Sequence, residues 1–149
     1  MDAPNDAAAQ KSGLEYLQEM VANWHGSAMA QLMDMRLIAV ADGTATFEAH
    51  PSPKFYNPQM RVHGGYCATL LDSALGCAVQ SKLPALVGYG TIELKVNYVR
   101  KLDVTAGRIL CTGNVIHAGR TMLTAEARVV DEAGKLYAHG SGTFLVYPT

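Results

Sequence analysis

The sequence predicts an α+β protein in which a curved antiparallel sheet of five to six strands wraps around one long buried helix. Residues 66–81 are apolar on nearly every side, which is typical of a helix that is buried all round. The chain beyond residue 90 reads as consecutive strands separated by short turns. The sheet needs a cover for its apolar face, and this helix can supply one. Because one helix covers so little sheet, we expect another subunit to cover part of the rest.

The N-terminal part predicts a helix and a hairpin before the buried helix. Residues 1–11 resemble a loose tail. Ser12 and Glu15 form a capping-box pattern, followed by apolar residues at helical spacing, so we expect a helix over 13–23. Asp42-Gly43 predicts a hairpin turn between two strands. Three prolines then predict a loop over 51–60.

The C-terminal part predicts the remaining strands. Residues 91–99 alternate between polar and apolar side chains, as in a half-buried strand. The apolar face is expected to carry Ile92, Leu94, Val96 and Tyr98. Thr91 belongs to the opposite, polar face in this pattern. Three further strands are expected over 107–117, 121–131 and 135–147.

Length and charge limit the classes of function. With 149 residues, the chain is expected to form a single domain over 1–149. The 12 basic and 13 acidic residues give a net charge of −1, which argues against a nucleic-acid surface. The adjacent pair Arg100-Lys101 suits a small phosphorylated ligand at most. The polar N-terminus and the absence of a long apolar run predict a cytoplasmic protein with no membrane partner.

The sequence predicts neither a metal nor a cofactor. The three cysteines lack C-x-x-C spacing, so they are interpreted as small buried apolar residues rather than as ligands or a disulfide framework. Neither a G-x-G-x-x-G motif nor a P-loop is present.

Asp72 lies within the apolar helix, and no lysine or arginine is one turn away from it. Four of five neighbours on its helix face are small, namely Gly65, Ala68, Thr69 and Gly76, with Val79 as the fifth. A poorly solvated carboxylate without a cation is a candidate general base or nucleophile. The alternative is a structural acid that backbone amides or nearby hydroxyls satisfy.

Gly64 and Gly65 begin the same helix. Backbone N–H groups at a helix N-terminus attract negative charge, so they can stabilise an oxyanion while Asp72 acts two turns along. The alternative is that the glycines serve only the turn. His63, next to them, becomes a candidate residue of the site.

With these residues assembled, the segment NPQMRVHGGYCATLLDSALG over 57–76 resembles the signature of hotdog-fold acyl-CoA thioesterases, most closely the phenylacetate-pathway (PaaI-like) group. The resemblance extends over about residues 30–147 and implies the hotdog fold. It also implies that the site lies at a dimer interface, where Asp72 of one chain would face Asn57, His63 and Gly64 of the other. Such dimers commonly pair into tetramers.

The resemblance implies the following catalytic roles. Asp72 would be the general base or nucleophile. The amide of Gly64, with that of Gly65, would polarise the thioester carbonyl. Asn57 and His63 would shape the site, and Thr91 would help to hold the water.

For substrate binding, the resemblance points to four residues where relatives meet coenzyme A: Arg100, Lys101, Gly119 and Arg120. Many relatives have a glycine and a small hydroxyl residue where this chain has Met60 and Arg61, so the pocket shape is expected to differ. Arg61 is a candidate ligand for the nucleotide. Tyr66, Met60 and Leu71 are candidates for the acyl wall, and the alternative places them in the core.

The expected reaction is hydrolysis of an acyl-CoA thioester to the free acid and CoA, the CoA being part of the substrate rather than a cofactor. Asp72 would activate water or attack first, and the sequence favours neither route. One alternative is a hotdog hydratase or dehydratase, which would need a histidine close to the Asp. The other is a non-catalytic acyl-CoA binding or sensor module.

Overall fold

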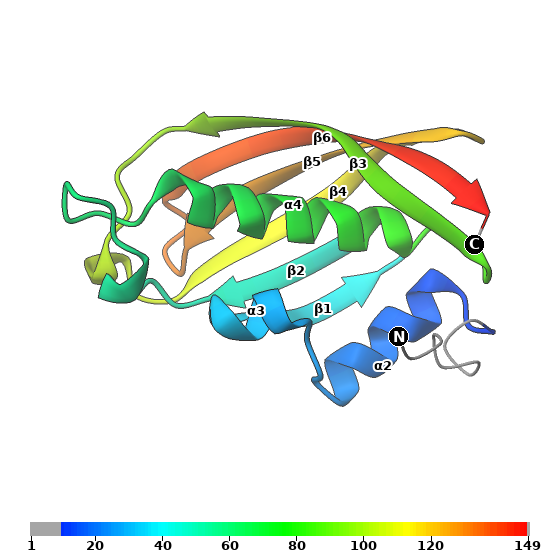
Figure 1. Ribbon diagram of the computed structural model, residues 1–149, viewed down its shortest axis with the longest axis horizontal. Coiled ribbons are helices and arrows are strands. Elements are labelled where there is room, and N and C mark those ends of the chain that lie inside the picture. The colour runs from blue at the N-terminus through cyan, green and yellow to red at the C-terminus, as the bar shows by residue number, and fades with distance from the viewer. Residues whose placement is uncertain (1–9, 149) are drawn as a thin grey trace.

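The computed structural model describes residues 10–148, and within them a six-stranded antiparallel sheet curves around the helix α4 (Figure 1). The strands lie in the order β1-β2-β4-β5-β6-β3. The helices are α2 (Gly13–Ala22), α3 (Ala28–Leu32) and α4 (Gly64–Gln80). The strands are β1 (Met35–Ala41), β2 (Thr44–Ala49), β3 (Val87–Tyr98), β4 (Ile109–Ala118), β5 (Met122–Asp131) and β6 (Leu136–Pro148). The expected α+β architecture is therefore confirmed. The tail expected at the N-terminus lies outside the described residues, apart from residues 10 and 11.

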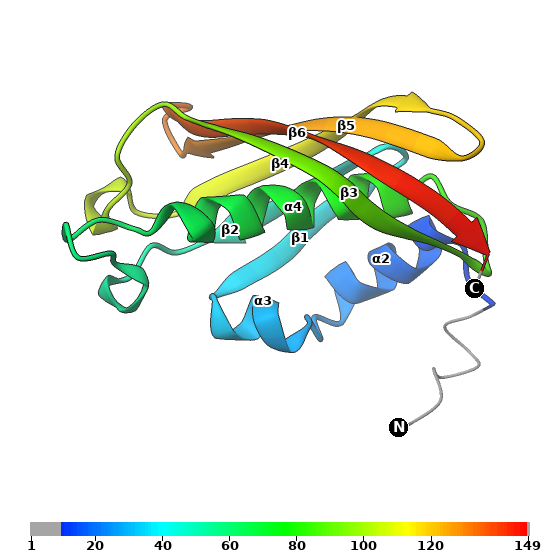
Figure 2. The same cartoon turned by 45° about the horizontal axis from the view of Figure 1, so that its top comes forward.

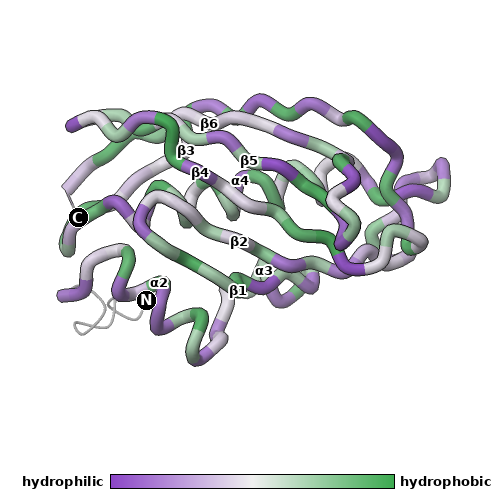
Figure 3. Tube along the Cα trace, turned by 180° about the vertical axis from the view of Figure 1, so that it is seen from behind, coloured by the Kyte–Doolittle hydropathy of each residue, from purple (hydrophilic) through white to green (hydrophobic). Residues whose placement is uncertain are grey.

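The core lies between α4 and the concave face of the sheet. Fully buried apolar residues of α4 fill this layer: Leu70, Leu71, Ala74, Leu75, Ala78 and Val79. The sheet approaches the helix closely at Gly113 of β4, where an added Cβ would stand 2.5 Å from the carbonyl oxygen of Ala74. Seen from behind, the strands mix hydrophobic and hydrophilic residues, as expected for a sheet covered on one face (Figure 3).

The N-terminal helices lie on the side of β1, below α4 (Figure 2). The capping box of α2 is confirmed, because the Ser12 hydroxyl accepts from the Glu15 amide at 3.3 Å and the Glu15 carboxylate accepts from the Ser12 amide at 2.8 Å. The short helix α3 was not expected from the sequence. Its N-cap Ser27 accepts from the Ala30 amide at 3.2 Å.

The central elements differ from the expected ones mainly at their ends. The hairpin at Asp42-Gly43 is confirmed by β1 and β2, with Gly43 at a φ of 80°. Helix α4 begins at Gly64, one of the two glycines expected to begin it, and His63 is its N-cap. Strand β3 begins at Val87, before the predicted start. No helix among the described residues is long and apolar enough to cross a membrane.

The two edges of the sheet are β1 and β3. Strand β3 pairs only with β6, so one side of its backbone has no strand partner in the part of the chain that the structure describes. It is also the strand that runs along α4 and carries Thr91.

Candidate active site

The start of α4 presents one free backbone donor. The His63 Nδ1 accepts from the Gly65 amide at 2.8 Å, and the His63 carbonyl accepts from the Tyr66 amide at 2.9 Å. No hydrogen-bond partner is found for the Gly64 amide among residues 10–148. Of the two glycines expected to polarise a carbonyl, Gly64 is thus available and Gly65 is occupied by the cap.

Tyr98 fixes this helix start to the end of β3. Its hydroxyl donates to the Gly64 carbonyl at 2.8 Å, and an added Cβ at Gly64 would lie only 3.0 Å from the Tyr98 oxygen. Burial raises the pKa of Tyr98, so the hydroxyl stays protonated and can donate. Sequence analysis did not single out Tyr98 for the site, because its contact depends on β3 ending beside α4.

The loop before α4 uses Asn57 to hold its own shape. The Asn57 side-chain oxygen accepts from the amides of Gln59 and Arg61, at 3.0 and 3.3 Å. The side-chain NH₂ of Asn57 makes no hydrogen bond within the described residues, and Asn57 lines the same cleft as Gly64. Asn57 therefore shapes the loop and keeps two donors for a ligand or a neighbouring chain.

We call this space the basic cleft, and its volume is about 320 Å³. Asn57, Arg61, Gly64, Arg100 and Lys101 line it. The Arg100 guanidinium donates to the carbonyl of Leu136, which leaves further donors for an anion. Three cations beside a free helix N-terminus make a surface suited to a phosphorylated ligand.

Asp72 lies elsewhere on α4. It lies eight positions after Gly64, which is about 12 Å along a helix axis. The Thr91 hydroxyl donates to Asp72 Oδ1 at 3.0 Å, and no lysine or arginine forms an ion pair with Asp72 in the described chain.

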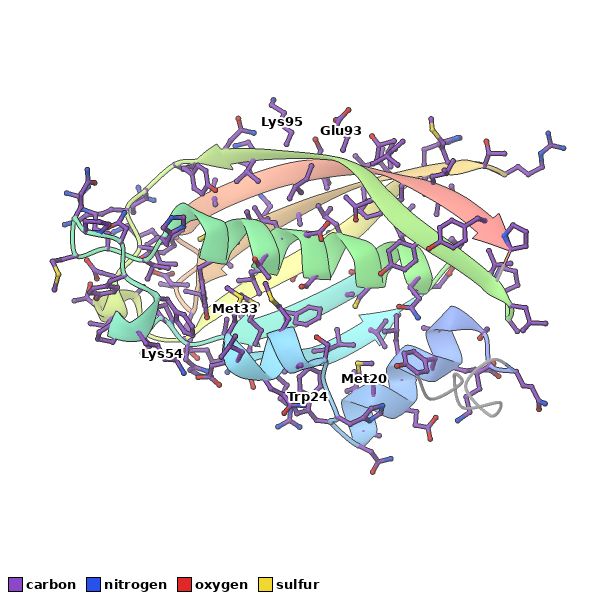
Figure 4. All side chains as sticks on the ribbon, viewed as in Figure 1. Met20, Trp24, Met33, Lys54, Glu93 and Lys95 are labelled. Atoms are coloured by element: carbon purple, nitrogen blue, oxygen red, sulfur yellow. The ribbon has the colours of Figure 1, made fainter. Side chains whose placement is uncertain are left out.

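A β-bulge brings Thr91 to Asp72. The register of β3 against β6 shifts between Thr91 and Glu93, so Ile92 is the extra residue. Thr91 before the bulge and Leu94 after it both face α4, whereas Ile92 is 58% exposed. Glu93 and Lys95 point away from α4 (Figure 4). The alternation expected over 91–99 is therefore confirmed for Leu94 and Val96, which pack against the core, and was wrong for Thr91 and Ile92, because the bulge exchanges their faces.

Asp72 and Thr91 line a second space of about 440 Å³, which we call the acid chamber. Apolar and aromatic side chains form much of its wall: Leu17, Met20, Trp24, Phe47 and Tyr89. Cys77 also lines it, but burial raises the pKa of this thiol to about 12, so it remains protonated and is a poor nucleophile. Asp72 is the group in the chamber best suited to activate water or to attack a carbonyl.

The other predicted binding residues separate into different environments. Gly119 and Arg120 line a pocket with Lys82, apart from the basic cleft of Arg100 and Lys101. Met60 is 71% exposed and lines neither the basic cleft nor the acid chamber. Tyr66 is buried in the core and donates to the carbonyl of Met33 at 3.0 Å. Leu71 is fully buried as well, so Tyr66 and Leu71 lie where the alternative interpretation placed them.

The acid chamber contains residues that sequence analysis did not select, above all Met20 and Trp24 from the N-terminal segment and Tyr89 from the start of β3. The amphipathic pattern of α2 predicted that the helix packs against the rest of the protein, but it did not predict which face of the sheet or which residues it contacts. The tertiary structure was needed to assign Met20, Trp24 and Tyr89 to the acid chamber.

Comparison with known proteins identifies the family of this chain. A family model described as the thioesterase superfamily matches residues 60–138, which include Gly64, Asp72 and Thr91. A protein of Halobacterium salinarum, proposed by its name to be an esterase, is 38% identical over 94 residues, which are 58% of this chain and 60% of that protein. The 1,4-dihydroxy-2-naphthoyl-CoA hydrolase of Listeria monocytogenes is 25% identical over 109 residues, which are 72% of this chain and 86% of the hydrolase.

Solved structures share the fold. A conserved protein of Pseudomonas aeruginosa is 32% identical, with a TM-score of 0.77 over 82% of this chain and 95% of that one. The PaaI protein of the Escherichia coli phenylacetic acid degradation operon is 20% identical, with a TM-score of 0.77 over 89% of this chain and 94% of its own. Since the family model covers more than half of the chain and the sheet wraps around α4 as the resemblance implied, this chain belongs to the thioesterase superfamily and has the hotdog fold.

Proposed function

We propose that this protein hydrolyses acyl-CoA thioesters to the free acid and CoA. The observation that carries the proposal is Asp72, a carboxylate that accepts one hydrogen bond from Thr91, has no cation beside it and lines a chamber with apolar walls. In a member of the thioesterase superfamily, such a carboxylate suits either activation of water or direct attack on the thioester carbon.

The proposed site combines two chains. Within one chain, the free amide of Gly64 lines the basic cleft while Asp72 lines the acid chamber. The exposed edge of β3 offers a route to join them, because an edge strand can pair with a second copy. Antiparallel pairing of two β3 strands would bring the Tyr98 end of one alongside the Val87–Thr91 half of the other. Gly64 is hydrogen-bonded to Tyr98, and Asp72 is hydrogen-bonded to Thr91. Because the pairing would place Tyr98 of one chain near Thr91 of the other, Gly64 of each chain would approach the acid chamber of its partner.

In this arrangement the Gly64 amide would donate to the thioester oxygen as negative charge develops on it. Thr91, which donates to Asp72, can also accept a hydrogen bond from a water beside the carboxylate. Arg61, Arg100 and Lys101 of the basic cleft would meet the CoA phosphates. Pairing of such dimers into tetramers and a cytoplasmic location remain predictions from the sequence.

The alternatives fit less well. A hydratase would need a histidine beside the acid, and no histidine of the described chain lines the acid chamber. The Nδ1 of His63, the histidine nearest the proposed oxyanion donor, is already engaged with Gly65. A non-catalytic acyl-CoA sensor would use the same clefts, so only an activity measurement separates it from an enzyme.

The test is thiol release from a panel of acyl-CoAs, with the wild type beside Asp72→Asn. We expect the wild type to cleave at least one of them and the variant to lose about 10²–10⁴-fold in kcat. Asp34→Asn is the matched control, because Asp34 is exposed and has a φ of 52°, which asparagine adopts readily. Equal activity of Asp72→Asn and wild type would sink the proposal. Binding without turnover by the wild type would favour the sensor.

A further inference from the structure

The free N–H of Gly64 belongs to the peptide that joins His63 to Gly64. The carbonyl of this peptide, on His63, accepts from the Tyr66 amide at 2.9 Å, and the His63 amide donates to the Phe55 carbonyl at 2.8 Å. Backbone hydrogen bonds therefore hold the peptide before Gly64. Because glycine has no Cβ to restrict its backbone angles, the N–H keeps one direction only if the peptide after Gly64 is held as well.

The peptide that joins Gly64 to Gly65 is held by two side chains. Its N–H, on Gly65, donates to the His63 Nδ1 at 2.8 Å, and its carbonyl, on Gly64, accepts from the Tyr98 hydroxyl at 2.8 Å. The first bond joins residues two positions apart, whereas the second spans 34 positions and comes from the end of β3 (Figure 1). Tyr98 thus ties the first residue of α4 to the sheet.

The contact between Tyr98 and Gly64 is close because position 64 has no side chain. An added Cβ would stand 3.0 Å from the Tyr98 oxygen and 3.1 and 3.3 Å from two carbons of its ring. Burial raises the pKa of Tyr98, so its hydroxyl stays protonated and donates to the carbonyl. A backbone donor that is held in place before the reaction needs no reorganisation when negative charge develops beside it.

Other hydrogen bonds hold the cation that lies next to Tyr98 in the basic cleft. The Arg100 amide donates to the Tyr137 carbonyl at 3.1 Å, and the Arg100 guanidinium donates to the Leu136 carbonyl. Neither bond involves the Tyr98 hydroxyl. Removal of that hydroxyl should therefore release the Gly64 peptide and leave Arg100 in place.

We propose that Tyr98 is a positioning residue, which holds the Gly64 N–H in the direction that stabilises the oxyanion of the reaction. It acts through the Gly64 carbonyl and does not touch the reacting atoms. The inference rests on the proposed function, since it assumes that the Gly64 N–H donates to the thioester oxygen. The alternative is that the Tyr98 hydroxyl binds the CoA directly, since Tyr98 lines the basic cleft.

The test uses wild type and Tyr98→Phe, with an acyl-CoA that the wild type cleaves and the N-acetylcysteamine thioester of the same acid, which lacks the nucleotide. We expect Tyr98→Phe to lower kcat for the acyl-CoA about tenfold with KM unchanged, and to lower kcat/KM for the short thioester by the same factor. A residue that binds the CoA would instead change KM and act on the acyl-CoA alone.

Tyr147→Phe is the matched control. The Tyr147 hydroxyl, like that of Tyr98, donates to a backbone carbonyl of β3, but its acceptor is Tyr89 at 2.9 Å, near the opposite end of the strand. We expect Tyr147→Phe to keep the wild-type kcat.

A double variant tests whether Tyr98 acts through the Gly64 N–H. Gly64→Pro removes that N–H, so adding Tyr98→Phe to it should cost no further activity. If the two losses multiply, Tyr98 acts elsewhere and the inference fails. A raised KM with unchanged kcat in Tyr98→Phe, a loss confined to the acyl-CoA, or an equal loss in Tyr147→Phe would overturn it as well.

If the wild type cleaves no thioester, the proposed hydrolysis fails, and Tyr98 is then judged by amide NMR of protein made with isotope-labelled glycine. The Gly64 signal is identified by its absence from Gly64→Pro. We expect Tyr98→Phe to lower the order parameter of the Gly64 N–H, and Tyr147→Phe to leave it unchanged. That result would sustain the positioning of the amide, and an equal order parameter in wild type and Tyr98→Phe would end the inference.

Discussion

The start and the middle of α4 lie in different chemical environments. At its start, the basic cleft holds a free backbone amide, an asparagine NH₂ and three cations. Midway along it, the acid chamber holds a carboxylate, one hydroxyl bonded to it and walls of Met, Trp, Phe and Tyr. The first environment suits an anion and the second an apolar group. In the proposed mechanism, α4 would carry the donor that stabilises negative charge at its start and the attacking group at its middle. Each proposed site would combine the donor of one chain with the acid of the other.

The proposed oxyanion donor of the basic cleft, the Gly64 N–H, can be removed by one substitution. Gly64→Pro removes the backbone N–H at the first position of α4, where proline is well tolerated, and His63 before it already has a compatible φ of −58° and ψ of 139°. We expect kcat to fall about 10²–10³-fold, the usual effect of losing one oxyanion donor. Gly64→Ala is the control, because it adds a Cβ beside Tyr98 but keeps the N–H. Equal losses in both variants would mean that the amide is not the donor.

Co-expression of the two variants tests whether Asp72 and the Gly64 amide of one site come from different chains. Asp72→Asn and Gly64→Pro, each expected to be nearly inactive alone, are co-expressed with different tags. In a two-fold dimer, half of the molecules are mixed and each mixed dimer has one intact site, so about a quarter of wild-type activity should return. If the site lies within one chain, the mixture stays inactive.

A smaller effect is expected at the hydroxyl that contacts the acid. Thr91→Val keeps the β-branched shape on β3 but removes the donor to Asp72. We expect a loss of about tenfold in kcat, since one hydrogen bond to a charged group is removed. Steady-state kinetics beside Thr112→Val provides the comparison, because Thr112 pairs with Thr46 on β2 away from the acid. Equal kinetics for Thr91→Val and wild type would mean that the Thr91 hydroxyl does not assist Asp72.

The smallest effect concerns the cap of α4. His63→Ala removes the acceptor for the Gly65 amide, and we expect the free energy of unfolding to fall by about 1 kcal/mol. His63→Asn, which restores a capping side chain, should recover most of that stability in urea denaturation. If the stability of His63→Ala equals that of wild type, the contact with Gly65 does not hold the helix start.

Much of the fold could be predicted from the sequence. The capping box at Ser12 and the Asp42-Gly43 turn are local signals, because their bonds join residues within a few positions of each other. The apolar surface of residues 66–81 predicted a buried helix, since few other arrangements hide so many apolar side chains. The same sequence drew attention to Asp72 and to the glycines of the helix start.

The faces of Thr91 and Ile92 at the bulge of β3 could not be predicted, although those of Leu94 and Val96 were. A bulge at Ile92 depends on how β6 pairs with β3, and the alternating pattern over 91–99 contains no sign of it. Without that bulge, Thr91 would point away from Asp72. The donor that contacts the acid is therefore a consequence of strand pairing between segments about 50 residues apart in the chain.

The sequence by itself determined the buried helix, its acid and the free N–H groups at its start, because each follows from local spacing along one element. Only the tertiary structure decided that Thr91 contacts Asp72, that Tyr98 donates to the Gly64 carbonyl and that residues of α2 and Tyr89 line the acid chamber. These features depend on which side chains distant elements bring within hydrogen-bond or van der Waals distance. Sequence periodicity reports the face of an element but not the partner that the face meets.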